Sequence, residues 1–212
     1  MSNRYARILA AGCSAVLAAT LAAAPAVAAA TWTIQPGGAM TATSARPTLK
    51  DAKTGTVLVC ASASASGTLK HGSGLPGPHV GSLSVVGFTR CTGPGHSDIV
   101  IILQAADLPW HVSLSSYNAA TSVVTGTVSH IQIMLRGNGC TAVIDGTSDT
   151  ASDGRVRFTY TDSTGRLTLL AAGGNLHFWN VSAGCLGLVV TSDRATLSGA
   201  FTVSPKQAIT SP

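Results

Sequence analysis

The sequence predicts an all-β protein: an antiparallel meander that forms a β-sandwich or a β-barrel, preceded by a cleaved helical signal peptide. Three observations lead to this fold class. The chain has no glutamate and only four lysines in 212 residues, although these two residue types are common on helix surfaces. Serine, threonine, glycine and valine are abundant instead, which favours strands and turns. Several segments alternate apolar with polar residues between closely spaced turn signals.

The first thirty residues (1–30) have the pattern of a secretory signal peptide. Arg4 and Arg7 precede a short apolar run, and the small-residue stretch 22–30 contains two A-x-A matches. We expect cleavage near Ala28 or Ala30, so that no membrane span remains in the mature chain. A secreted, extracellular protein is therefore predicted, with the cell wall as one place where it would reside.

Cleavage leaves an even set of four cysteines, together with eleven basic and eight acidic side chains. In an exported protein, Cys60, Cys91, Cys140 and Cys185 predict two disulfides. Three pairings exist, and we favour Cys60 with Cys91 and Cys140 with Cys185 because each pair closes a local segment. No C-x-x-C spacing supports the rival interpretation of a zinc site.

The strands are predicted from alternation along the chain. In 110–115 and 155–160, apolar residues alternate with polar ones, as in a strand with one buried face. The run 99–103 is apolar on both faces, which is typical of a central, fully covered strand. The other predicted strands are 56–60, 82–89, 127–135, 140–144, 166–170, 176–181 and 195–203. Because the connections between them are short, we expect one all-β domain over 31–205 and a C-terminal tail at 206–212.

Two segments rich in glycine and proline, 71–81 and 91–98, predict loops rather than strands. If Cys60 pairs with Cys91, these loops would lie at one end of the fold. They would then gather four candidate contact residues: His71, His79, His96 and Asp98. Imidazole and carboxylate groups can bind zinc or copper, but the spacings lack a short, geometry-fixing interval, so no metal is predicted.

Asp145, Asp149 and Asp153 recur every four residues, which raises the hypothesis of a calcium loop. The D-x-D-x-D-G pattern of such loops is absent, and hairpin turns at Asp145-Gly146 and Asp153-Gly154 explain these residues.

No catalytic residues are predicted. No serine lies in a G-x-S-x-G elbow, and the lack of glutamate disfavours a glycosidase with two carboxylates. Four arginines (Arg136, Arg155, Arg157 and Arg166) without interleaved aromatics predict a solvated face and no nucleic acid partner.

The mature region resembles a group of uncharacterised small secreted proteins of actinobacteria. The likeness covers nearly all of the mature chain and is carried by TWTIQPGG (31–38), SGTLK (66–70), CTGP (91–94), LPWH (108–111), DGTS (145–148), GGNLH (173–177) and VSPKQ (203–207). The resemblance implies export and a β-rich fold. No activity is attached to the group, so it carries over no functional residues.

The sequence thus predicts an exported, disulfide-stabilised, non-enzymatic β-domain that acts as an extracellular or cell-wall-associated binding or structural protein. Its loops would contact a cell-wall polymer or another extracellular protein. The alternative is a barrel or sandwich that carries a small apolar ligand or a metal, with the strand 99–103 as lining. A hydrolase of unrecognised type is the third interpretation. No cofactor is predicted, and the oligomeric state stays open.

Overall fold

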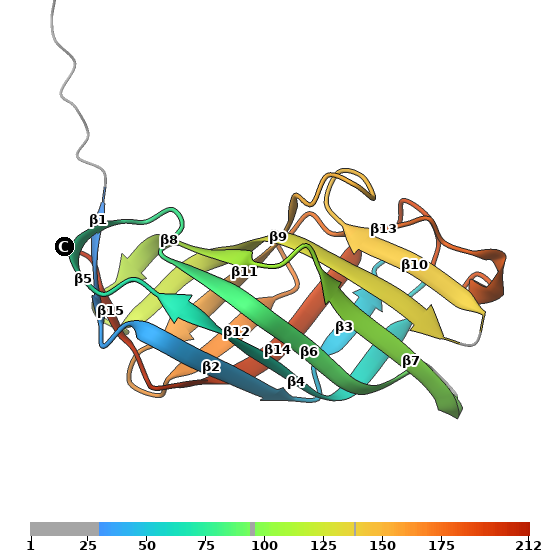
Figure 1. Cartoon of the computed structure of the whole chain (residues 1–212), viewed down its shortest axis with the longest axis horizontal. Coiled ribbons are helices and arrows are strands. Elements are labelled where there is room, and N and C mark those ends of the chain that lie inside the picture. The colour runs from blue at the N-terminus through green and yellow to red at the C-terminus, as the bar shows by residue number, and fades with distance from the viewer. Residues whose placement is uncertain (1–29, 94–95, 138) are drawn as a thin grey trace, which may run out of the picture.

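A computed structural model describes residues 30–93, 96–137 and 139–212, without the side chains of residues 96–100, and Figure 1 shows its elongated shape. In this part of the chain there are fifteen strands and one short 3₁₀ helix, η1 (Ala183–Cys185). The strands are β1 (Thr31–Gln35), β2 (Gly38–Ala45), β3 (Thr48–Asp51), β4 (Val57–Leu69), β5 (Gly72–Pro76), β6 (Gly81–Gly93), β7 (His96–Ala106), β8 (Trp110–Asn118), β9 (Val123–Gly137), β10 (Cys140–Asp145), β11 (Gly154–Thr161), β12 (Arg166–Leu170), β13 (His177–Trp179), β14 (Ala195–Ser204) and β15 (Ala208–Thr210).

Eight antiparallel strands close into a barrel. The hydrogen-bonded order is β11, β12, β14, β2, β4, β6, β8 and β9, and β9 pairs again with β11. Closure satisfies the backbone groups that would otherwise line two sheet edges. The all-β prediction is confirmed, and of its two architectures the protein adopts the barrel.

Four long strands, β4, β6, β9 and β14, run beyond this barrel and form a second half with other partners. There β3 replaces β2, β7 replaces β8, and β10 replaces β11. The strand β13 pairs with β10, and a single bridge between His177 and Arg194 joins it to the start of β14. The molecule is therefore two stacked β-rings that share four strands.

Two left-handed residues mark the junction between the halves. Arg90 in β6 has φ +46° and His130 in β9 has φ +65°. In β9, Val128 and Ile131 are both buried although they are three residues apart, so His130 is the extra residue that reverses the alternation. Such a bulge lets one strand bury alternate residues in both halves.

A three-stranded sheet, β15-β1-β5, lies across one end of the barrel, beside the C-terminus in Figure 1. It contributes the buried side chains of Trp32, Ile34 and Ile209. The segment 206–212, which the sequence sets apart as a tail, is part of this fold: Gln207 is buried and β15 pairs with β1.

Two loop predictions are wrong. Within 71–81, residues 72–76 form β5, where Gly72 (φ +116°) and Gly74 (φ +70°) adopt backbone conformations that other residues rarely tolerate. Within 91–98, β6 continues to Gly93 and β7 begins at His96. Glycine-rich sequence marked irregular backbone there, but it did not prevent strand pairing.

The full burial predicted for the strand 99–103 is also wrong. Leu103 is 4% exposed, but Ile102 is 57% exposed on the outer face of β7. The side chains of Ile99 and Val100 lie outside the described residues. The ten predicted strands are all present, and several are longer than predicted.

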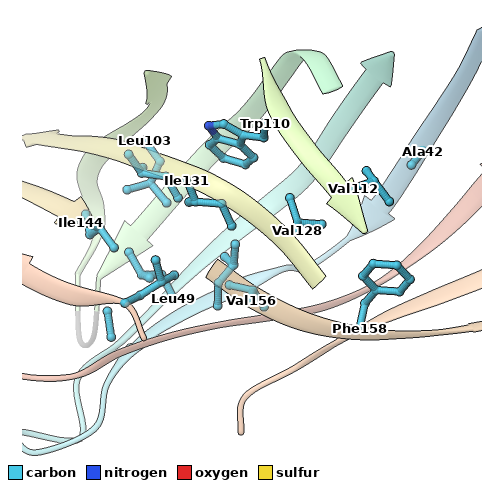
Figure 2. Packing of buried hydrophobic residues seen from close by; sticks show 14 of the residues in the cluster. Ala42, Leu49, Leu103, Trp110, Val112, Val128, Ile131, Ile144, Val156 and Phe158 are labelled. Atoms are coloured by element: carbon cyan, nitrogen blue, oxygen red, sulfur yellow. The ribbon is translucent and has the colours of Figure 1, made fainter. Parts of the chain in front are cut away.

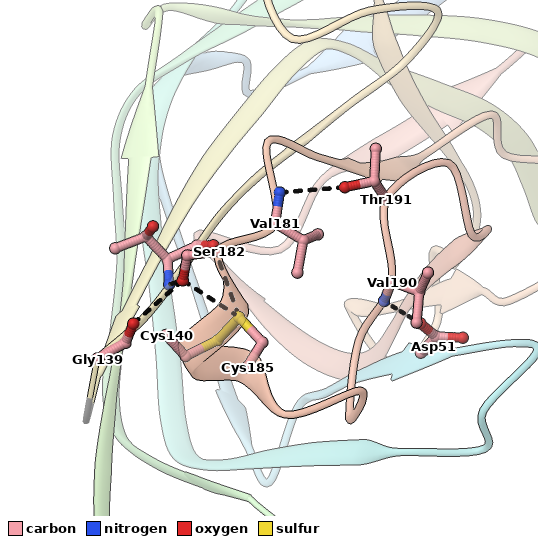
Figure 3. The surroundings of a disulfide bond; sticks show 9 residues. Asp51, Gly139, Cys140, Val181, Ser182, Cys185, Val190 and Thr191 are labelled. Atoms are coloured by element: carbon pink, nitrogen blue, oxygen red, sulfur yellow. Dashed lines mark hydrogen bonds between the residues drawn. A yellow bond between two sulfur atoms is a disulfide. The ribbon is translucent and has the colours of Figure 1, made fainter.

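Both predicted disulfides are present, and both lie in the second half. Cys60 and Cys91 are directly opposed on β4 and β6, with their Cα atoms 3.8 Å apart. Cys140 on β10 is bonded to Cys185 in η1. Figure 3 shows the second bond beside the loop after η1, where the Val190 amide donates to Asp51 and the Val181 amide to Thr191.

The predicted signal peptide lies almost entirely outside the described residues. Across residues 30–93, 96–137 and 139–212, no helix has the length and apolar character needed to cross a membrane.

Candidate binding site in the barrel lumen

The interior of the closed barrel contains an apolar cavity of about 100 Å³. Val112, Val128, Val156 and Phe158, seen in Figure 2, belong to its wall. Strand register brings these side chains together: Val128 is opposed by Val112 on one side and by Val156 on the other. Of the 25 residues that line the cavity, only Ser64, Trp110, Tyr160 and Gln207 carry side-chain nitrogen or oxygen atoms, and the Trp110 indole nitrogen donates to the Ala106 carbonyl.

The cavity follows from small residues on one wall. Along β2 and β4, the inward positions that face each other are Ala42 with Ala65 and Ser44 with Ala63. An eight-stranded barrel is just wide enough to be filled by large side chains or to hold one small ligand. With alanine and serine on two of its eight strands, this barrel is not filled.

Large inward side chains on β6, β12 and β14 keep part of their surface accessible. Leu167 and Phe201 are directly opposed on β12 and β14 and line the cavity, yet neither is fully buried. The same holds for Leu83, Val86, Phe88 and Leu169. The unfilled volume therefore lies against leucine, valine and phenylalanine side chains, which offer dispersion contacts and no hydrogen bonds.

A hydrogen-bonded plug closes the lumen at the end covered by β15-β1-β5. Gln207 is 1% exposed, and its side chain accepts from the Gly37 amide (2.9 Å) and donates to the Pro205 carbonyl (2.8 Å). The Tyr160 hydroxyl donates to the Gln207 carbonyl (2.9 Å) and accepts from its amide (2.8 Å). Burial, opposed by the hydrogen bond with Gln207, raises the pKa of Tyr160, so the hydroxyl stays neutral at physiological pH. The polar groups at this end are paired with each other rather than presented to the lumen.

Asp162 lies outside this plug, in a polar surface hollow that also includes His71 and Lys206. Its Oδ2 accepts the Ile209 amide (2.9 Å), whereas Oδ1 is buried and has no partner among the described residues. Burial raises the pKa of Asp162, although the hydrogen bond from Ile209 opposes the shift.

The structure does not bring the four candidate contact residues together. His71 lies near the capped end, where its Nδ1 is 2.8 Å from the Pro36 carbonyl oxygen. In Figure 1, β7 begins at the opposite end of the molecule from β5. The side chains of His96 and Asp98, at the start of β7, lie outside the described residues. The two predicted loops lie apart because 71–81 joins β4 to the start of β6, whereas 91–98 follows at the far end of β6.

His79 instead packs against His111, which in turn lies beside His130; these two histidines fall within the predicted strands 110–115 and 127–135. Its ring stacks on that of His111, with centroids 4.7 Å apart and planes 9° from parallel. The centroid of His130 is 5.6 Å from that of His111. Burial, followed by the neighbouring His79 and His130, lowers the pKa of His111. One signal was present in the sequence: each of these three histidines is adjacent to a large apolar residue of the barrel wall.

The three aspartates of the calcium hypothesis each have their own donors. Asp145 is fully buried and accepts from Gln132 and from the amides of Gly146, Ser152 and Gly154. Asp153 accepts hydrogen bonds from the backbone amide and the hydroxyl of Thr147. The hydrogen bond from the amide is the main reason why the pKa of Asp153 is lowered. Asp149 accepts from the Asn180 side chain. These carboxylates organise the β10–β11 loop.

Comparisons with known proteins give no further guide to the site. No protein-family model, no curated protein and no solved structure matches the chain. Among the described residues, no group of three histidine, cysteine or acidic side chains is arranged to hold a metal ion.

Proposed function

We propose that the protein is an exported, disulfide-stabilised carrier that binds a small apolar ligand inside its barrel. The observation that supports this proposal is the unfilled lumen, which is lined almost entirely by hydrocarbon side chains. Protein interiors are normally packed to the density of organic crystals. An apolar cavity of this size lowers stability, and an apolar ligand that fills it recovers the lost contacts.

The cavity volume limits the ligand class. An apolar cavity of about 150 Å³ is large enough to bind benzene or xenon. At about 100 Å³, this lumen would accept an atom such as xenon or a compact hydrocarbon group. The ligand needs no charge, because the wall offers no charged group to meet one. The sequence also raised a carrier of an apolar ligand, but with the strand 99–103 as its lining. That strand does not line the cavity, which is bounded by other strands of the barrel.

Export remains part of the proposal, supported by the sequence of the leader and by the two disulfides, which suit an oxidising compartment. Kinship with the actinobacterial secreted proteins and contact with a cell-wall polymer or an extracellular protein are predictions that stand on the sequence. A carrier that acts outside the cell would meet its ligand there.

The direct test is binding of xenon, benzene and cyclohexane to the purified mature protein. Xenon-129 NMR would report occupancy of the lumen, and thermal unfolding would report stabilisation by each compound. We expect xenon binding to saturate. Of the two larger probes, we expect benzene to bind more tightly than cyclohexane, because it is the smaller molecule. Ligand carried through purification would appear as extra mass under native conditions that is lost on denaturation.

Two matched variants locate the binding. Ala63→Leu adds three carbons inside the lumen, whereas Ala61→Leu makes the same change at an exposed position of the same strand. Xenon binding should be lost in A63L and kept in A61L. Equal binding in both variants would mean that xenon binds elsewhere, and the lumen would then have no role as a carrier site.

A further inference from the structure

Three histidines form a cluster on the outside of the barrel wall, at the junction between the two halves. His79 comes from the turn before β6, His111 from β8 and His130 from the bulge in β9. We refer to these three residues as the histidine trio. Their ring centroids are 4.7 Å and 5.6 Å apart in successive pairs. The other described histidines, His71 and His177, instead have a ring nitrogen close to a backbone carbonyl.

The trio is not arranged as a metal site. A metal ion lies in the plane of each imidazole that binds it, so two stacked parallel rings cannot direct their nitrogens at one ion. His79 and His111 are stacked in this way, and no three ligand-type side chains of the described residues converge. The arrangement is instead one in which neutral rings pack together and protonated rings repel each other.

Each member of the trio is the chain neighbour of a residue that lines the lumen. Val80 follows His79, Trp110 precedes His111, and Ile131 follows His130. The three lumen residues are at most 3% exposed. A displacement of the histidine backbone would therefore move the inner wall directly.

The trio also lies near the point where β6 changes its pairing partner from β8 to β7. His111 is paired with Ser82 on β6 and with Ser129 on β9. Beyond Leu83, β6 leaves β8 and pairs with β7 from Gly87. The ladder that holds β8 to β6 is thus only three residue pairs long. Short ladders open at lower free energy than the central part of a sheet.

The charged groups around the trio do not offer it a free carboxylate. Arg155 is paired with Ser129, on the strand next to His111, and the Lys70 amide donates to the carbonyl of Val80. Asp107 lies in the β7–β8 turn and accepts from Ser152, while Asp153, before β11, accepts from Thr147. The charged groups that act on His111 are His79 and His130, and neither of these two carboxylates is among them.

We propose that protonation of the histidine trio loosens the β6–β8 wall and releases the apolar ligand from the lumen in mildly acidic surroundings. This inference rests on the proposed carrier function and adds regulation of the same site. The pKa of His111 is lowered by burial and by its two histidine neighbours, so the packed wall disfavours the protonated form of this ring. Acidification then adds charges within a few ångströms of one another, which favours the more open wall.

The experiment compares xenon affinity and exchange rate at pH 7.5 and pH 5.0 in the full mature chain. We expect affinity to be about tenfold weaker at pH 5.0, with faster exchange, because the open wall holds the added charges farther apart than the packed wall does. The test variant is H79N/H111Q/H130N. Asparagine suits positions 79 and 130, whose φ values are +52° and +65°, because it tolerates the left-handed region. The matched control is H71N/H177N, which removes two histidines outside the trio.

The trio variant should bind xenon equally at both pH values, and the control variant should behave like the natural chain. The single variant H79N, in an exposed turn, provides a milder test and should lose part of the pH dependence. Circular dichroism at pH 5.0 would establish that release precedes unfolding. Absence of xenon binding at pH 7.5 would overturn the carrier function and this inference with it. Binding that is the same at both pH values, or pH dependence that persists in the trio variant, would overturn this inference alone.

Discussion

The two halves of the molecule share four strands but differ in how their interiors are filled. In the second half, Leu135, Ile144 and Phe178 are at most 2% exposed, and both disulfides lie there. In the barrel half, Leu167, Leu169 and Phe201 point inward and remain partly accessible around a cavity. The same β-ladder thus supports one packed core and one hollow core.

The difference lies in side-chain volume rather than in strand pairing. Alanine and serine on β2 and β4 leave the barrel lumen open, whereas leucine, isoleucine and the Cys60–Cys91 bond occupy the corresponding space in the second half. A hollow core has fewer dispersion contacts and is less stable. The packed half therefore has the closer side-chain contacts, and the hollow half has room for a ligand.

The largest expected effect follows from removing a disulfide of the packed half. Replacing both Cys140 and Cys185 by alanine should lower the free energy of unfolding by about 4 kcal/mol, because the bond closes a segment with a sequence separation of 45. Denaturant unfolding would measure the loss. If the hollow half is a separate site, xenon affinity under folding conditions should change little. A loss of xenon binding in the folded variant would mean that the two halves are not independent.

The next effect compares one substitution in each half. Leu135→Ala, at a 2% exposed position, should cost about 3 to 5 kcal/mol. Leu169→Ala should cost about 1 to 2 kcal/mol, because that side chain already borders empty space and loses fewer contacts. Denaturant midpoints at constant m-value would give both numbers. Equal costs would contradict a hollow lumen, and an enlarged lumen in L169A should admit benzene more readily.

The strands are predictable from the sequence where one face alternates cleanly, as in β8 and β11. The strands β1, β2, β3, β5 and β15 are not, because their sequences are short or rich in glycine, alanine and threonine and gain their strand form from pairing partners far along the chain. The disulfide pairing was correct because both bonds close local segments. The strand 99–103 was placed too deeply, because an apolar composition does not show which face meets water.

The binding site was harder to predict than the fold. The lumen depends on which residues of eight strands face one another, and this register is fixed by tertiary pairing. Bulges also change the inward face, as at His130, so simple alternation fails where β9 passes from one half to the other. The histidine trio combines residues 32 and 19 positions apart, and nothing in a local pattern joins them.

A smaller effect comes from adding volume instead of removing it. Ala142→Leu in the packed half should cost about 1 to 3 kcal/mol by overpacking, because Ala142 is 2% exposed among large neighbours. Ala63→Leu enters the lumen and should be close to neutral, or stabilising by about 1 kcal/mol, because it fills space that exists. Thermal unfolding of the two variants would decide. A strongly destabilised A63L would indicate that the lumen cannot accept even a few added atoms.

The smallest effect concerns a carboxylate at the capped end of the barrel half. Asp162 has its pKa raised by burial, so the folded state holds this proton more tightly than the unfolded chain does. Protonation therefore favours folding, and stability contributed at this site is lost as the pH rises from about 3.8, the ordinary aspartate value, through the raised value. Asp162→Asn should remove this dependence and change stability at pH 7 by less than about 1 kcal/mol, since solvent screens a partly exposed group. Unfolding curves of D162N and the natural chain from pH 3 to pH 7 would test the sign. A natural chain whose stability rises more steeply than that of D162N across this window would show that burial of Asp162 is outweighed by its hydrogen bond to the Ile209 amide.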